Sequence, residues 1–94
     1  MGIISQNIEI VNSAGLHTRA AVKLAQIARN ARSKIWILRN GNKADASSIL
    51  DILMMACPKG SVIKIAIEQK EDIPVFNNII QLIENGFGEL YESR

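Results

Sequence analysis

The chain has 94 residues, of which 48% are hydrophobic, and a formal net charge of +2 at pH 7. This is enough for one small unit with a single core and too little for two, so one domain over residues 1–94 is expected. No apolar run approaches the ~20 residues of a membrane span, and no basic segment followed by an apolar one marks a signal peptide. These absences predict a cytoplasmic protein without membrane insertion.

The first predicted elements are a strand over residues 5–11 and a helix over residues 18–31. Ile8, Glu9 and Ile10 alternate apolar and polar, which is typical of a strand with one buried face. After a turn, apolar residues recur at helical spacing with polar residues opposite. The helix is expected to pack on its alanine-rich side.

The next predicted element is a hairpin. Residues 34–39 are β-branched and aromatic in character, Asn40-Gly41 is a two-residue turn signal, and a return strand follows over residues 42–46. Trp36 should face the other side of the sheet from its two neighbours and be partly exposed.

Two helices and a strand complete the chain. Ser48 and Asp51 form a weak capping box that opens a short helix ending near Met55. A strand covers residues 62–68, and Asp72 caps a last helix that stops at Gly86.

The order βαββαβα predicts an α+β fold, an open-faced β-sandwich with a four-stranded antiparallel sheet and three helices on one face. The core is expected to form from inward-facing apolar residues, namely Ile8, Ile10, Leu24, Ile27, Ile35, Ile37, Ile63, Ile65, Phe76, Ile79, Ile80 and Ile83. The single cysteine, Cys57, excludes an internal disulfide, gives no support to a metal site and is interpreted as a buried hydrophobe; a redox role is the less favoured alternative.

Residues 15–21 place the chain's single histidine between a glycine and an arginine, where the first long helix begins. A neutral imidazole is a nucleophile near pH 7, because the ordinary pKa of histidine is about 6.5. The unpaired N–H groups of a helix start and an arginine fork both bind phosphate oxygens. His17 is therefore interpreted as a phosphoryl acceptor and Arg19 as a phosphate ligand, with Thr18 and Ala20 in a phosphate cradle. The simpler alternative is that His17 only ends a loop and that Arg19 lies over the first turn.

The motifs Asn40-Gly41, Ser47-Ser48-Ile49-Leu50, Pro58-Lys59-Gly60 and Asn85-Gly86-Phe87 follow the histidine motif in order. Together they resemble the HPr family, the histidine phosphocarriers of the bacterial phosphotransferase system, over nearly the whole chain. Two positions depart from the family pattern: Ala20 stands where most relatives have proline, and Ala14 replaces a residue that is often polar. Leu53-Met54-Met55 and the Asn85-Gly86-Phe87 ending resemble the nitrogen-regulatory branch more than the sugar-transport branch.

The resemblance implies the same fold and a phosphocarrier with no cofactor, which is a monomer and not an enzyme. Nδ1 of His17 would accept a phosphoryl group from an Enzyme I type phosphodonor and pass it to a IIA-type acceptor. The few charge-assisted bonds that this site offers hold a phosphate but fall short of what an enzyme supplies. A partner must therefore complete the site.

The short helix carries more apolar residues than it can bury on one side. Some should be exposed and form a partner-binding patch rimmed by Arg19 and Arg29, with Ile49 and Leu53 as the expected exposed pair. The alternative is that all of them belong to the core. The proposed patch consists of Leu16, Val22, Arg29, Ile49, Leu50, Leu53 and Met54.

The resemblance also implies that Ser48 is the serine that an HPr kinase/phosphorylase modifies in some members. A purely capping serine is the slightly favoured alternative. A regulatory interaction module, switched by phosphorylation at His17 or Ser48 without sugar transport, is the second function considered. Nucleic-acid binding is disfavoured, because Trp36 is the only strand aromatic.

Overall fold

The computed structural model describes residues 3–89. Its elements are β1 (Ile4–Glu9), α1 (Thr18–Ala28), β2 (Ile35–Arg39), β3 (Asn42–Asp45), α2 (Ile49–Met54), β4 (Val62–Ile67) and α3 (Ile73–Glu84), with short 3₁₀ turns at Lys70–Asp72 and Gly86–Gly88. The order confirms the predicted βαββαβα arrangement. The first strand lies at residues 4–9 rather than 5–11, and α1 ends at Ala28 rather than Ala31.

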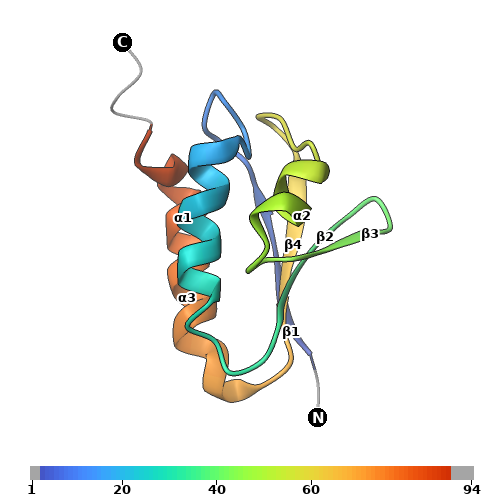
Figure 1. Cartoon of the computed structure of the whole chain (residues 1–94), viewed down its shortest axis with the longest axis vertical. Helices are drawn as coiled ribbons and strands as arrows, with labels where there is room; N and C mark the ends of the chain where they lie inside the picture. The colour runs from blue at the N-terminus through green and yellow to red at the C-terminus, as the bar shows by residue number, and fades with distance from the viewer. Residues whose placement is uncertain (1–2, 90–94) are drawn as a thin grey trace.

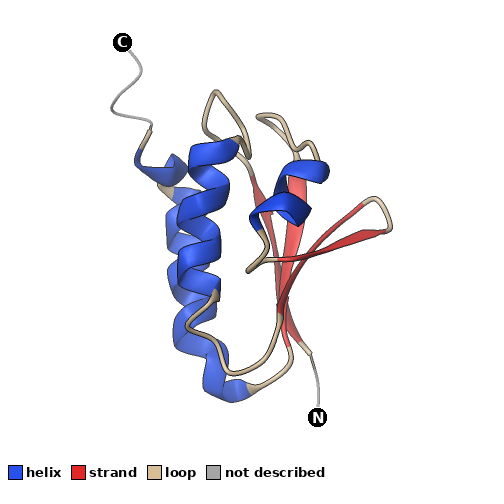
Figure 2. Ribbon diagram, in the orientation of Figure 1, coloured by secondary structure: helices blue, strands red, loops and turns tan. Residues whose placement is uncertain are grey.

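The four strands form one antiparallel sheet in the order β1-β4-β2-β3. The helices cover one face of it, with α1 and α3 side by side and α2 near the start of α1 (Figures 1 and 2). The open-faced α+β sandwich is therefore confirmed. The start of α1 and the end of α3 lie at the same end of the molecule. The candidate functional site lies at this end.

The core lies between the sheet and the helices. All of the predicted core residues are buried except Ile27, which is half-buried because α1 turns its small residues inward (Ala20, Ala21, Ala25 and Ala28, with Leu24). Small side chains allow the helix to approach the sheet closely. Ile52, Ile67 and Phe87 are fully buried core members that the pattern did not include.

The two predicted caps differ in outcome. Ser48 Oγ accepts the N–H of Asp51 at 3.2 Å and so caps α2. Asp72 occupies the N-cap position of α3, but its side chain does not cap the helix. The buried carboxylate instead accepts the backbone N–H groups of Arg32 and Ser33 at 2.7 and 3.0 Å, because these lie on the turn that it packs against.

The uncovered face of the sheet carries Trp36, which is half-exposed as expected. Its indole N–H donates to Glu68 at 2.9 Å, and the Lys43 ammonium lies 4.2 Å from the ring centroid. Among residues 3–89, no helix is long and apolar enough to cross a membrane.

Candidate functional site

Residues 12–17, hereafter the histidine loop, are pressed against the segment that follows α2. Gly15 has a φ of +67°, and a Cβ at this position would lie 2.4 Å from the carbonyl oxygen of Cys57. The same carbonyl accepts the N–H of Leu16 at 2.9 Å. The glycine that precedes the histidine is therefore required by both its backbone angle and its close backbone neighbour.

Asn12 holds the loop from the inside. Its side chain is fully buried, and its Nδ2 donates to the carbonyl of Gly15 and to Oε1 of Glu89, both at 2.9 Å. The two amide hydrogens thus connect the loop to the C-terminal turn. Burial without these partners would be costly for an amide.

His17 is the N-cap residue of α1, with extended backbone angles and a side chain that is 27% exposed. Its Nδ1 accepts the N–H of Arg19 at 3.3 Å, while its Nε2 lies 2.5 Å from Oε2 of Glu89. A carboxylate only accepts, so Nε2 carries the hydrogen in this contact and Nδ1 carries the lone pair. The geometry thus fits a neutral imidazole with its nucleophilic nitrogen at the helix start.

Glu89 reaches the histidine through a turn of unusual backbone conformation. Gly86, Phe87 and Gly88 all have positive φ, at 62°, 58° and 77°. Phe87 is held in this left-handed state by full burial and by Lys23, whose Nζ donates to the Phe87 carbonyl at 2.7 Å. The strain of a non-glycine residue here is offset by the packing that surrounds it.

Two opposing effects set the pKa of Glu89. Burial raises the pKa, but hydrogen bonds from Asn12 and His17, the charge that His17 carries when it is protonated and the charge of Arg19 lower it, and the net result lies below the ordinary value. The carboxylate is therefore ionised at neutral pH and available to pair with a cationic imidazole.

The other predicted site residues surround this centre. Thr18 and Arg19 are exposed on the first turn of α1, and Ala20 is buried beneath it. The first-turn backbone of α1 thus lies beside the lone pair of His17. Within residues 3–89, no group of three or more His, Cys, Asp or Glu side chains has the arrangement of a metal site.

The structure contradicts the expected exposed pair on α2. Leu50 and Met54 are 66% and 75% exposed, whereas Ile49 and Leu53 are half-buried. The reason is Ile52, which is fully buried and turns the helix so that the opposite stripe, residues 50 and 54, faces outward. Leu16 is also buried and is not available to a partner, and Val22 is half-buried.

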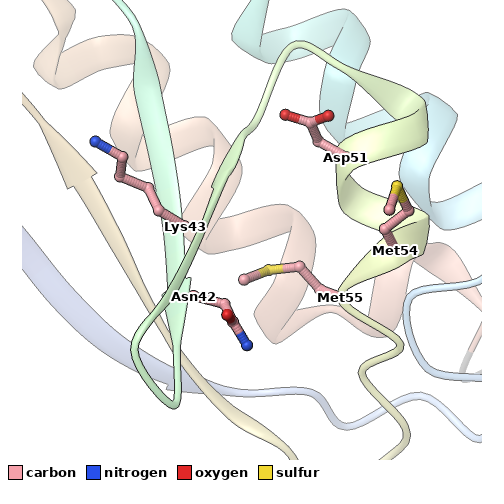
Figure 3. Close-up of a pocket in the computed structure, with 5 residues that line it drawn as sticks. All are labelled: Asn42, Lys43, Asp51, Met54 and Met55. Atoms are coloured by element: carbon pink, nitrogen blue, oxygen red, sulfur yellow. The ribbon is translucent and has the colours of Figure 1, made fainter.

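A hollow of about 350 Å³ separates α2 from β3. Figure 3 shows Met55 extending toward Asn42 on β3, and Met54, on the last turn of α2, also lines this hollow. Leu50 and Met54 are both exposed and lie one helical turn apart, and we call these two residues the docking stripe.

Cys57 is buried, and burial raises the pKa of its thiol, although nearby Arg39 opposes this. Because its thiolate form is disfavoured, this thiol does not fit the redox alternative.

Ser48 is half-buried, and its hydroxyl oxygen caps α2.

Sequence reasoning missed three residues of the site, Asn12, Lys23 and Glu89. Asn12 lies in the turn after the first strand, and Glu89 lies 77 positions further along the chain. The paired glycines around Phe87 were the one local signal, since they indicate a chain reversal after α3.

Comparison with known proteins identifies the family. The family model described as "PTS HPr component phosphorylation site" matches residues 4–85. The phosphocarrier protein HPr of Neisseria meningitidis serogroup A is 33% identical over 87 residues, which cover 93% of this chain and 98% of that protein. The phosphocarrier protein NPr of Escherichia coli K12 is 31% identical over 92% of this chain and 97% of its own length.

A solved structure leads to the same conclusion. The crystal structure of HPr-C-His from Thermoanaerobacter tengcongensis superposes with a TM-score of 0.83 at 34% identity, covering 92% of this chain and 97% of that one. The chain therefore belongs to the HPr family of phosphocarrier proteins of the phosphotransferase system.

Proposed function

We propose that this protein carries a phosphoryl group on Nδ1 of His17 in the cytoplasm, as a single-domain monomer that is not itself an enzyme. The donor would be a phosphohistidine on an Enzyme I type protein, and the acceptor a IIA-type protein. The observation that carries the proposal is the opposite bonding of the two ring nitrogens. Nε2 contacts the Glu89 carboxylate, whereas Nδ1 accepts a long hydrogen bond from the backbone N–H of Arg19 at the start of α1.

The transfer step follows from this arrangement. The Nδ1 lone pair of His17 attacks the phosphorus, and the bond from phosphorus to the donor's nitrogen breaks with its electron pair returning to the donor imidazole. His17 then becomes a phosphorylated imidazolium that keeps its hydrogen on Nε2. The ionised Glu89 pairs with that new positive charge.

The phosphate would be held by groups at the helix start. The Arg19 N–H, released from Nδ1, would donate to a phosphate oxygen together with the backbone N–H groups of Thr18 and Ala20. The Arg19 guanidinium adds a planar fork of donors. In a loose phosphoryl transfer, positioning and charge stabilisation are nearly all that a protein contributes, and the partner's site supplies the remainder.

The docking stripe supports the partner part of the proposal. Leu50 and Met54 are large, apolar and exposed, and exposed Arg29 donates to the carbonyl of Ser47, three residues before Leu50. Apolar anchors with a basic rim are typical of transient protein interfaces. Half-buried Ile49, Leu53 and Val22 would contribute at the edge.

Regulation by a serine kinase is a weaker proposal. Modification of Ser48 by an HPr kinase/phosphorylase would esterify the hydroxyl whose oxygen caps α2. A phosphate is tolerated at a helix start, so it would act by placing a charge beside the docking stripe and hindering binding. The capping role accounts for the serine without a kinase. The choice between sugar transport and a purely regulatory relay depends on which acceptor takes the phosphoryl group.

The experiment is phosphorylation by Enzyme I and phosphoenolpyruvate, followed by intact mass before and after acid treatment. We expect one phosphoryl group that acid removes, its loss in His17→Ala, and its retention in Ser48→Ala. Arg19→Ala should slow the transfer and Arg19→Lys should restore only part of the rate. An acid-stable phosphate, or full phosphorylation of His17→Ala, would reject the proposal.

A further inference from the structure

The end of α1 opposite to His17 borders a second hollow, of about 390 Å³, which we call the basic cleft. α1 has 11 residues, so the cleft lies about 16 Å along the helix from the histidine site. Its polar lining consists of Arg29, Arg32, Ser33, Lys34, Asp45 and Ser47. Figure 1 shows the chain leaving α1 at this end on its way to β2.

The charge of the cleft is positive. Three cationic side chains and one carboxylate line it, which leaves a formal charge of +2. Both oxygens of that carboxylate, Asp45, are already engaged: Oδ1 accepts the N–H and the hydroxyl of Ser47 at 2.9 and 2.7 Å, and Oδ2 accepts from Lys34 at 3.2 Å. Asp45 thus fixes the wall of the cleft and does not balance the two arginines.

The walls of the cleft are held in place without a ligand. The buried carboxylate of Asp72 accepts the backbone N–H groups of Arg32 and Ser33. Arg29 Nε donates to the carbonyl of Ser47 at 3.3 Å and connects the two sides. A preorganised site loses less entropy when a ligand binds.

A structural explanation accounts for only part of this arrangement. Basic residues near a helix C-terminus complement its dipole, which would explain Arg29. The last carbonyls of α1 are already bonded by the N–H groups of residues 29, 30 and 31. Arg32 and Lys34 lie beyond the helix, yet line the same hollow as Arg29.

We propose that the basic cleft binds the phosphate group of a small phosphorylated metabolite. Guanidinium forks suit phosphate oxygens, and the volume is within the range of small-molecule sites. Such a ligand would compete with an acidic partner for Arg29. The cleft would thereby couple metabolite concentration to docking.

The test is a titration of the ¹⁵N-labelled full chain with glycerol 3-phosphate, followed through amide shifts at constant ionic strength. Saturable shifts are expected at residues 31–34 and 45–48, with no response to glycerol. Arg32→Gln should weaken binding about tenfold and leave the Asp72 contacts intact, because these use the backbone. Lys59→Gln, an exposed change of equal charge elsewhere, is the matched control and should bind like the original chain.

A second arm separates the cleft from the histidine site. His17→Ala should retain the shifts around the cleft. Shifts confined to residues 16–20, shifts that never saturate, or equal affinities for Arg32→Gln and Lys59→Gln would overturn the proposal. Equal binding of malonate would overturn the assignment to phosphate esters.

Discussion

The histidine loop and α2 lie at the same end of the molecule but are built in opposite ways. The loop is held by polar contacts on several sides, through the buried amide of Asn12, the carbonyl of Cys57 and the carboxylate of Glu89. The short α2 is anchored mainly by Ile52 and leaves Leu50 and Met54 in solvent. One region therefore fixes the position of an atom, and the other presents apolar surface.

This difference corresponds to two needs of a phosphocarrier. Phosphoryl transfer requires a nucleophile held in a defined orientation. Recognition of more than one partner is better served by adaptable side chains, and methionine is well suited to this because it is flexible and polarizable. Substitutions in the loop should therefore affect stability and chemistry, whereas substitutions on the docking stripe should affect binding alone.

The largest effect is expected for Gly15→Ala. A left-handed alanine costs about 1–2 kcal/mol, and its Cβ would meet the Cys57 carbonyl at 2.4 Å, which adds about 1–3 kcal/mol of overpacking. We expect a loss of about 3 kcal/mol or more in urea unfolding. Gly41→Ala is the control, because Gly41 has a φ of +80° but nothing within 4 Å of a new Cβ. Equal losses in the two variants would show that the close approach to Cys57 has no cost.

The second largest loss of stability is expected for Asn12→Ala. It leaves the Gly15 carbonyl and Glu89 each without one partner, and we expect a loss of about 2 kcal/mol together with slower phosphorylation of His17. Asn7→Ala, at an exposed position of β1, should change neither. Unaltered transfer in Asn12→Ala would mean that Glu89 reaches His17 without help from the amide.

Glu89→Gln tests the pH dependence of the same contact. Because the pKa of Glu89 is lowered by folding, its carboxylate stabilises the protein above the ordinary glutamate pKa of about 4.3, and this contribution is lost as the pH falls through the lowered value. The variant should therefore be less stable by about 1–2 kcal/mol at pH 7. The difference should shrink as the pH falls through the lowered pKa of Glu89.

The control for Glu89→Gln is Glu84→Gln, at an exposed position near the end of α3. Unfolding is to be measured for both variants between pH 7 and pH 3. A difference for Glu89→Gln that stays constant over this range would contradict an ionised, paired carboxylate.

The fold could be predicted from sequence because its signals are local. Alternating apolar residues marked the strands, Asn40-Gly41 marked the hairpin, and the glycine, histidine and arginine of one heptapeptide marked the helix start. Each of these patterns depends on neighbours within a few residues. The structure places all of them close to where they were expected.

Only one part of the site, the heptapeptide with His17, could be predicted from sequence. The other part, Glu89, is distant in the sequence. Nothing within ten residues of His17 indicates Glu89, and the contact depends on a left-handed turn at Phe87 that few non-glycine residues adopt. The error on α2 has a different cause. The predicted patch on this helix takes in the apolar residues 49, 50, 53 and 54 but not Ile52. In a helix of six residues, one additional buried side chain changes which stripe is exposed.

The smallest effect on stability is expected on the docking stripe. Met54 is 75% exposed, so Met54→Ser should change the free energy of unfolding by no more than about 0.5 kcal/mol. Binding to an Enzyme I type partner should nevertheless weaken, because an apolar anchor is lost. Ile52→Ala, two residues earlier and fully buried, should cost about 2–5 kcal/mol. Calorimetric titration of the partner, beside thermal melts of both variants, separates the two roles: a Met54→Ser protein that binds normally would exclude the stripe from the interface.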